Sequence, residues 1–298
     1  MKLRAIPALL QETGFEWYAD RGPRLGAALA FYTLFSLAPL LIIITAIAAL
    51  AYGQEVAHAQ IIRQIEELIG REGADAIRAI IENAARPSSG VAATLIGLAT
   101  LLFGATIVFS ELQDALNTIW DIPPKPERGM VIGIMRDRFL SFVMVLSIGF
   151  LLLASMLANT ILTAIVQNFG DILPGRAYVL RIANSALFLS IVTLLFAMIY
   201  KMLPDTTIAW SDVVIGAVAT SLLFAIGKFL IGLYLVYSSV VSAYGAAGSL
   251  VVVLVWVYYS AQIFYFGAEF TKVYATRRGH RAVPPQEGSV VRQESLVE

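Results

Sequence analysis

Two charged residues lie inside long apolar runs of this sequence, and they are the first candidates for chemistry. Lys228 lies within the run from Val213 to Val236, and Glu269 lies near the end of the run from Ala247 to Thr271. Each run has about the 20 residues that a helix needs to cross a hydrocarbon core. A charge at that depth is costly, so each of the two side chains should face protein, water or a ligand rather than lipid.

Lys228 is expected in the outer half of its span. If the two runs form a hairpin, Lys228 lies opposite Trp256 and Glu269 lies opposite Ile215, so the two charges are too far apart to pair. No acidic residue of the predicted spans shares the depth of the lysine. The polar residues expected there, which with Lys228 would line a substrate or ion pathway for an anionic group, are Thr45, Asn159 and Asn184. The alternative is that Lys228 snorkels to the headgroups or makes only structural hydrogen bonds.

A second polar group is predicted on the cytoplasmic side of the membrane. Glu111, Asp114 and Asn117 follow one another at steps of three and end one helix, while Glu269 and Lys272 lie one turn apart at the end of another. We interpret the five residues as a candidate cytoplasmic gate or proton-responsive site, because buried carboxylates can change their protonation state near neutral pH. The alternative is ordinary capping and salt bridging at the membrane interface.

The composition excludes several kinds of chemistry. The chain has no cysteine and two histidines, His58 and His280, that lie far apart in the sequence. It contains no nucleophile elbow, no phosphate-binding loop and no dinucleotide-binding glycine motif. The formal net charge is zero, which gives no basic field for nucleic acid. We therefore expect no catalytic residues, no metal, no cofactor and no nucleic-acid partner, and a protein that is not an enzyme.

The chain is 58% hydrophobic and only 14% charged, which is typical of a membrane protein. The apolar runs predict an all-α, polytopic membrane domain over residues 25–275. Its six transmembrane helices are expected at about 25–52, 90–112, 139–166, 182–202, 213–236 and 247–271. Pro39 lies within the first span and should kink it.

Three segments are expected outside the bilayer. Residues 1–24 predict an amphipathic helix on the membrane surface or, as an alternative, a leader packed on the cytoplasmic ends of the spans. Residues 54–89 predict two short amphipathic helices, broken at Gly70 and Gly73, that cap the bundle. Residues 276–298 are polar and aperiodic, and we expect a disordered tail. Most lysines and arginines flank one side of the spans, which places both termini in the cytoplasm and the cap outside.

Small residues recur at helix-contact spacing, as at Gly216 and Thr220, and predict close helix packing. Four motifs then resemble the YihY/BrkB family of inner-membrane proteins. They are the stretch from Gly26 to Leu40, the end of the second span from Ala115 to Trp120, the stretch from Tyr200 to Asp205, and the last span with Tyr244-Gly245, Trp256-Val257-Tyr258 and Gly267-Ala268-Glu269.

The resemblance implies a six-span protein of the bacterial inner membrane. Family members have been labelled virulence or serum-resistance factors and, wrongly, ribonuclease BN, and the family supplies no established catalytic residues. From the polar residues at two depths we expect a transporter or translocator of an anionic lipid or small solute. The alternative is a non-transporting scaffold that holds envelope partners through its outer cap. The lipid bilayer is the expected partner, and the sequence leaves open whether the protein forms homo-oligomers.

Overall fold

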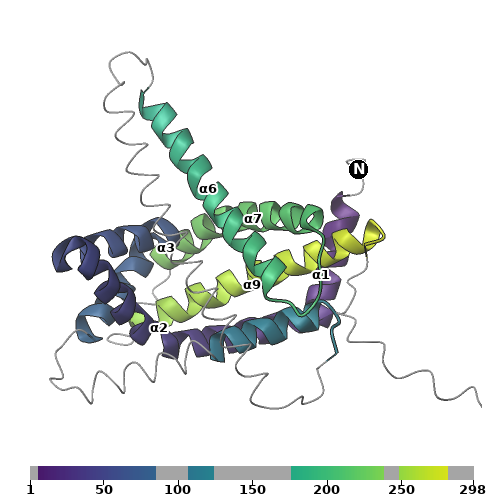
Figure 1. Cartoon of the computed structure of the whole chain (residues 1–298), viewed down its shortest axis with the longest axis horizontal. Coiled ribbons are helices and arrows are strands. Elements are labelled where there is room, and N and C mark those ends of the chain that lie inside the picture. The colour runs from purple at the N-terminus through teal and green to yellow at the C-terminus, as the bar shows by residue number, and fades with distance from the viewer. Residues whose placement is uncertain (1–5, 85–106, 124–175, 238–247, 281–298) are drawn as a thin grey trace, which may run out of the picture.

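The computed structural model describes residues 6–84, 107–123, 176–237 and 248–280, and within them the chain is helical (Figure 1). The helices are α1 (Ile6–Ala19), α2 (Gly22–Tyr52), α3 (Gln54–Ala84), α6 (Arg176–Met202), α7 (Trp210–Tyr237) and α9 (Gly248–Arg277), and residues 107–119 are also helical. The stretch formed by this last helix and the turn after it is called the 107–123 segment below.

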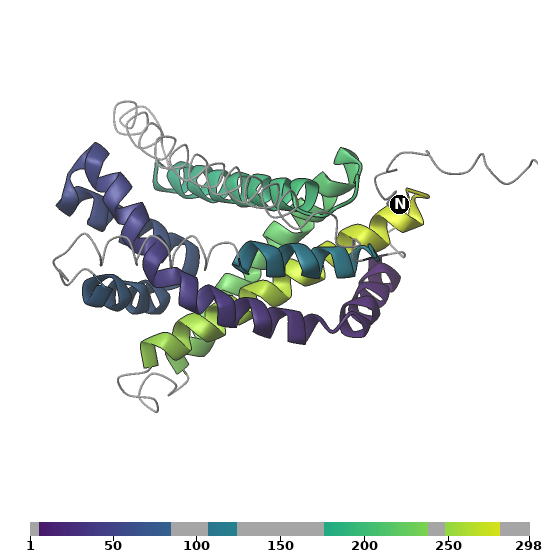
Figure 2. The same ribbon diagram turned by 60° about the horizontal axis from the view of Figure 1, so that its bottom comes forward.

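The long helix α9 is the centre of the bundle. It packs against α7, α2, α1 and α3, and its Phe264 also contacts Phe196 and Tyr200 of α6. α6 crosses the bundle obliquely and packs on α7, as Figures 1 and 2 show. α1 contacts the C-terminal part of α9, and α3 lies at the other end of the bundle. We call these two ends the α1 end and the α3 end.

Three helices of the described part are long and apolar enough to cross a membrane. They cover Ile182–Met202, Trp210–Leu235 and Leu250–Arg277, close to the last three spans expected from the sequence. The first expected span falls in α2, which is helical from Gly22 to Tyr52 and therefore through Pro39. The kink at Pro39 stays a prediction. The second and third expected spans fall mostly outside the described residues, so the count of six spans and the orientation also stay predictions.

α3 lies across the ends of three other helices. Its buried side chains Ile62, Ile77 and Ile81 pack with Leu41 of α2, with Ile231 and Leu235 of α7, and with Val252 and Val253 of α9. The sequence predicted two short helices here, whereas in the structure residues 54–84 are one continuous helical stretch.

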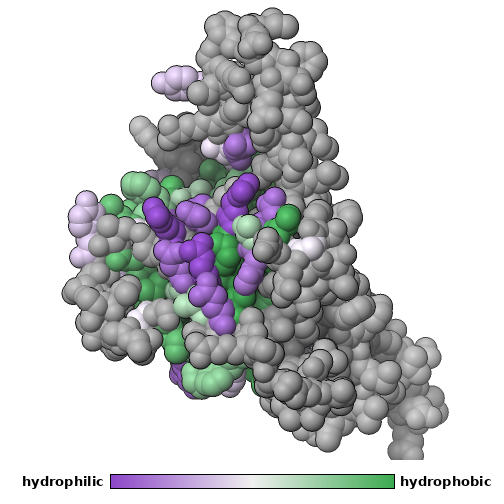
Figure 3. Space-filling model, turned by 90° about the vertical axis from the view of Figure 1, so that its left-hand side faces the viewer, coloured by the Kyte–Doolittle hydropathy of each residue, from purple (hydrophilic) through white to green (hydrophobic). Residues whose placement is uncertain are grey.

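The chain of α3 nevertheless folds back on itself. His58 and Glu82 line the same surface hollow, although 24 residues of straight helix would separate them by about 36 Å. Figure 3 looks onto this end and shows hydrophilic side chains gathered around a strip of hydrophobic ones.

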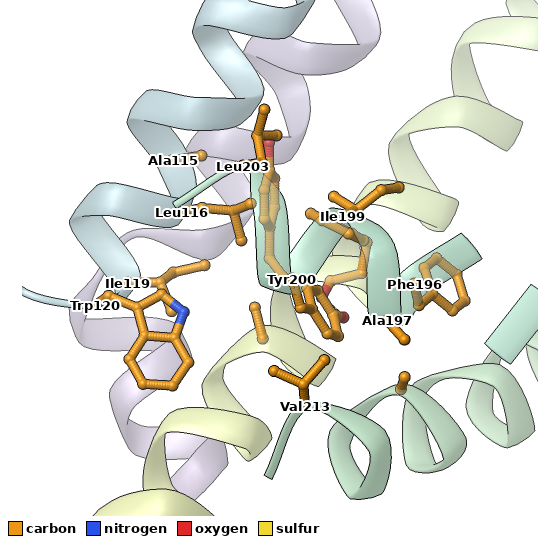
Figure 4. Packing of buried hydrophobic residues seen from close by; sticks show 14 of the residues in the cluster. Ala115, Leu116, Ile119, Trp120, Phe196, Ala197, Ile199, Tyr200, Leu203 and Val213 are labelled. Carbon is orange, nitrogen blue, oxygen red and sulfur yellow. The ribbon is translucent and has the colours of Figure 1, made fainter. Parts of the chain in front are cut away.

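At the α1 end the core is aromatic. Tyr200 of α6 is fully buried, and its hydroxyl donates to the carbonyl of Phe264 at 2.7 Å and lies 3.1 Å from Thr220 Oγ1. Leu116, Ile119 and Trp120 of the 107–123 segment pack on the same cluster (Figure 4). This packing fixes the 107–123 segment against α6 and α9, where it bears on the site described next.

Both ends of the described part are held by contacts with other helices. α1 is packed on α9 through Leu9, Val273 and Tyr274, and its place on the membrane surface stays a prediction. α9 continues to Arg277, and His280 bonds to Asp212, so residues 276–280 are ordered although we expected them in a disordered tail. Both segments are ordered by tertiary contacts, which cannot be read from the local sequence. The rest of that tail lies outside the described residues.

Candidate functional site

One face of α9 carries four polar side chains near the α1 end. Gln262, Tyr265, Glu269 and Lys272 follow at steps of three, four and three residues, which aligns them along one side of the helix. Tyr265 and Glu269 are fully buried. The start of α2 approaches this face closely at Gly26, where a Cβ atom would lie 1.9 Å from Gln262 Nε2. Glycine at that position therefore admits the amide of Gln262 between the two helices.

Lys272 is the hub of an ion-pair cluster drawn from separate parts of the chain. Its Nζ lies 2.7 Å from Asp121 Oδ2 in the 107–123 segment and 3.8 Å from both Glu16 Oε2 and Asp20 Oδ2 at the end of α1. The lysine side chain is only 14% exposed, so these interactions are less screened than those of a surface pair. One ammonium group thus ties two elements of the chain to α9.

The turns that deliver these acids are conformationally unusual. Arg21, directly after Asp20, has φ 57°, and Asp121 has φ 52°; they are the non-glycine residues with positive φ in the described ranges. Around Asp121 the N–H of Ile122 donates to the carbonyl of Asn117, which closes the helix end in a Schellman turn. A left-handed conformation costs an L-residue about 1–2 kcal/mol. Such strain concentrates at functional sites, and here it accompanies the placement of two carboxylates on Lys272.

Glu269 has an exceptional environment for a carboxyl group. It is 0% exposed, and neither of its carboxyl oxygens has a hydrogen-bond partner among the described residues. Asp20, Lys272 and Glu16 lie close enough to act on it electrostatically. Other buried polar atoms of this end share the lack of a described partner: Trp17 Nε1, Trp120 Nε1, Tyr265 Oη and both amide atoms of Gln262. Because such groups cost free energy unless they are bonded, their concentration at one end of an apolar bundle makes this end the candidate site.

The structure divides the candidate cytoplasmic gate into separate parts. Glu269 and Lys272 lie in the cluster, and Glu111 lies within electrostatic range of Tyr265. Asp114 is on an exposed face. Asn117 instead pairs with the loop between α6 and α7: its Nδ2 donates to Asp205 Oδ2 at 3.1 Å, and its Oδ1 accepts from the Asp205 N–H at 2.9 Å.

The sequence analysis did not identify Glu16, Asp20 and Asp121 as site residues. Glu16 and Asp20 are one helical turn apart just before the Gly22-Pro23 pair that begins α2, and Asp121 follows a tryptophan at a helix end. These features mark turns, but they do not show that both turns meet the same lysine. No group of three or more potential ligands is arranged to hold a metal ion in the residues that the structure describes.

Lys228 belongs to a different level of the bundle. Its Nζ lies over the ring of Phe188 of α6, 4.8 Å from the ring centroid. Asn184, one turn before Phe188, is exposed. The side chain of Thr45 and the whole of Asn159 lie outside the described residues, so their place beside Lys228 stays a prediction. The close contacts of Gly216 with Thr271 and of Gly267 with Thr220 set Lys228 level with Tyr259, about one turn from the expected Trp256.

The chain is similar to one family profile and to several bacterial membrane proteins. A profile of the family described as "Virulence factor BrkB" matches residues 16–290. A UPF0761 membrane protein of Azotobacter vinelandii is 27% identical over 281 residues, which cover 90% of this chain and 64% of the relative. One of Halorhodospira halophila is 27% identical over 292 residues, covering 94% and 61%. One of Idiomarina loihiensis is 31% identical over 182 residues, covering 60% of each chain.

The chain therefore spans about three fifths of the length of these relatives. No solved structure matches it. The family profile extends over nearly the whole chain and includes every residue of the Lys272 cluster. Together with the membrane-length helices, this match shows that the chain is an integral membrane protein of the BrkB family.

Proposed function

We propose that this protein is a transporter or translocator of an anionic lipid or small solute in the bacterial inner membrane, with no enzymatic activity of its own. The observation that carries the proposal is the fully buried Glu269, whose carboxyl oxygens have no described hydrogen-bond partner, in a helix of membrane-spanning length. An ionisable group at such a place is expensive to keep. A helix that served only as an anchor would be more stable with an apolar residue there.

Lys228 is the proposed contact for the anionic group. Its Nζ is held over Phe188 at the interface of α6 and α7, and the residue is only partly exposed. A partly desolvated ammonium group attracts phosphate or carboxylate more strongly than one in bulk water, because the effective dielectric constant is lower. With Glu269 at the α1 end, the α7–α9 pair carries a cation and a carboxyl group at two levels, which suits stepwise passage of an anion.

The test is a flux measurement in liposomes that contain the purified protein. One arm follows the movement of fluorescently labelled phosphatidylglycerol between leaflets, and another follows uptake of radiolabelled inorganic phosphate, so lipid and solute are distinguished. We expect Lys228→Gln to slow about tenfold the flux in whichever arm the parent protein supports, which corresponds to a free-energy difference of about 1.4 kcal/mol. The matched control is Lys201→Gln, because Lys201 bonds to the carbonyl of Ile208 near the α1 end. Flux equal to that of protein-free liposomes in both arms would overturn the proposal.

The scaffold hypothesis is favoured by the surface hollow of α3. His58, Arg63, Glu66, Arg78 and Glu82 line it, so both signs of charge surround one depression. Deleting the cap is a poor test, because Ile62, Ile77 and Ile81 pack against three other helices. Reversing the exposed charges Arg63 and Glu66 leaves that packing intact. A scaffold should then lose the envelope partners that cross-link to it in cells, whereas a transporter should keep its flux.

A further inference from the structure

The Lys272 cluster holds more negative groups than positive ones. Glu269 on α9 is surrounded by Glu16 and Asp20 from the end of α1, while Asp121 comes from the 107–123 segment. The one cation within range of Glu269 among the described residues is Lys272, on α9 itself. Glu111 acts electrostatically on Tyr265 next to the cluster, and α6 contributes the neutral Tyr200 hydroxyl. Four carboxyl groups, from the buried Glu269 to the exposed Asp121, therefore surround one ammonium group.

Asp20 lies 3.8 Å from Lys272 Nζ, and it is close enough to Glu269, one turn before Lys272 on α9, to act on it electrostatically. An ionised carboxylate only accepts hydrogen bonds, so two carboxyl groups can bond to each other only when one of them carries a proton. Like charges that act on one another in a buried site also favour keeping one group neutral. The carboxyl groups are spread around Lys272 rather than around one point, and no metal-holding group is found in the described ranges. A proton is the cation that this arrangement fits.

We propose that Glu269 binds an exchangeable proton, and that losing this proton draws Lys272 from Asp121 towards Glu269 and loosens the 107–123 segment from α9. The proton would be the coupling ion of the proposed transporter, so this role rests on the proposed function. The switch itself needs no substrate.

The geometry of α9 lets Glu269 compete with Asp121 for the ammonium group of Lys272. Glu269 and Lys272 are three residues apart on one helical face, where opposite charges pair readily. While Glu269 is neutral, the lysine makes its short contact with Asp121 at 2.7 Å. Once Glu269 is ionised, it competes for the same ammonium group. Asp121 lies in a left-handed turn, so loss of its charge partner removes a contact that helps to hold this conformation.

The proton has a route to water. The side chain of Asp20 is 20% exposed, that of Glu16 is 45% exposed and that of Asp121 is 73% exposed, whereas Glu269 is fully buried. The exposed fractions therefore rise from the buried carboxyl group to the surface across three acids. Protonation of Glu269 breaks and forms only an O–H bond and needs no further reactant.

The first test measures the movement of the 107–123 segment in the full chain. The protein has no cysteine, so the exposed positions Thr118 and Thr276 can be changed to cysteine and spin-labelled without background. We expect the distance between the labels to lengthen as the pH rises. Glu269→Gln should hold the short distance at every pH, and Asp121→Asn should give the long distance at every pH. The control Glu12→Gln removes an ion pair between α1 and α9 outside the cluster and should titrate like the parent.

The second test detects the proton directly. Infrared difference spectra of the reconstituted parent protein, recorded between acidic and alkaline pH, should contain the C=O band of a buried neutral carboxylic acid. That band should be absent from Glu269→Gln and present in Glu12→Gln. A distance that does not change with pH, or a titration that persists in Glu269→Gln, overturns the proposal. Neither measurement uses a substrate, so the two proposals can fail separately. If flux depends on Lys228 but the protein shows no such titration, the proposed function stands and only the proton switch is wrong.

Discussion

Thr271 of α9 lies directly on Gly216 of α7, so that a Cβ atom at Gly216 would be 1.8 Å from Thr271 Oγ1. The contact has a reciprocal partner, because a Cβ atom at Gly267 of α9 would be 2.0 Å from Thr220 Oγ1 of α7. Each hydroxyl donates at 2.7 Å to the carbonyl four residues earlier, which belongs to the glycine of its own helix. This interlock fixes the register of α7 on α9, and with it the separate levels of Lys228 and Glu269.

The interlock predicts that alanine is not tolerated at either glycine. Gly267→Ala would drive a methyl group into Thr220 and towards the Tyr200 hydroxyl, 2.7 Å from the ideal Cβ position. Overpacking of this kind costs about 1–3 kcal/mol. Thermal unfolding of the purified protein in detergent should therefore show a lower midpoint for Gly267→Ala and for Gly216→Ala.

The matched control for these two variants is Gly232→Ala, also in α7. A Cβ atom there meets nothing within 4 Å in the described structure. Helix propensity alone favours alanine over glycine by about 1 kcal/mol, so this variant should be as stable as the parent or more stable. Equal midpoints for all three alanine variants would show that α7 and α9 do not pack in this register.

The pair between Asn117 and Asp205 predicts a specific loss at the loop between α6 and α7. Asn117→Ala removes two hydrogen bonds and leaves the half-buried Asp205 carboxylate and N–H to find other partners. The expected destabilisation is about 1–3 kcal/mol. Limited proteolysis within residues 203–209 should accelerate in parallel.

Asp205→Asn and Thr118→Ala are the controls for this prediction. Asp205→Asn keeps an acceptor oxygen and the backbone donor for Asn117, so this variant should retain most of the stability of the parent protein. Thr118→Ala removes an exposed hydroxyl that bonds to the carbonyl of Asp114 within its own helix, and the stability of this variant should be close to that of the parent. If the protease cleaves Asn117→Ala no faster than Thr118→Ala, then Asn117 does not hold the loop between α6 and α7 in place.

Most of what the sequence could predict about the fold came from the lengths of its apolar runs. The ranges of the last three spans agree closely with the helices, because about 20 apolar residues leave few alternatives to a spanning helix. The same reasoning placed Lys228 and Glu269 at different depths. The register was about one turn off, because it was counted from the centre of the turn, whereas the glycine and threonine contacts determine it.

The site was only partly predictable, for a physical reason. Glu269 and Lys272 were found because a charge in an apolar helix is conspicuous in a sequence. Asp20 and Asp121 belong to turns, and their meeting at Lys272 depends on two left-handed residues and on how α1 and the 107–123 segment pack against α9. The partner of Lys228 was missed because we looked for polar neighbours at its depth, and Phe188 binds the ammonium group through its ring.

The contact of Lys228 with Phe188 predicts a measurable coupling between the two side chains. A cation over an aromatic face is worth about 0.5–2 kcal/mol, depending on how far it is desolvated. Phe188→Leu should therefore destabilise the parent protein more than it destabilises Lys228→Met. A double-mutant cycle of unfolding free energies isolates this difference. The control is a second cycle that combines Phe224→Leu with Lys228→Met. Phe224 packs on Trp256 and Phe196, so its coupling to Lys228 should be smaller. Equal coupling in both cycles would contradict the assignment.

The end of α9 is held to the start of α7 by a buried acid. Asp212, in the first turn of α7, is 0% exposed, and its Oδ2 lies 2.8 Å from His280 Nδ1, while its Oδ1 lies 4.0 Å from Arg278. Its negative charge also suits the N-terminal end of the helix dipole. His280→Ala should release the residues after Arg277 while leaving the α7–α9 interlock intact.

Trypsin provides the measurement, because Arg277 and Arg278 are exposed. We expect cleavage after these arginines to accelerate several-fold in His280→Ala and further in Asp212→Asn, since the asparagine also weakens the contact with Arg278. The histidine of α3 supplies the control: His58→Ala alters the other end of the bundle and should leave the cleavage rate unchanged. If His280→Ala is cut no faster than His58→Ala, the pairing of Asp212 with His280 does not order the end of α9.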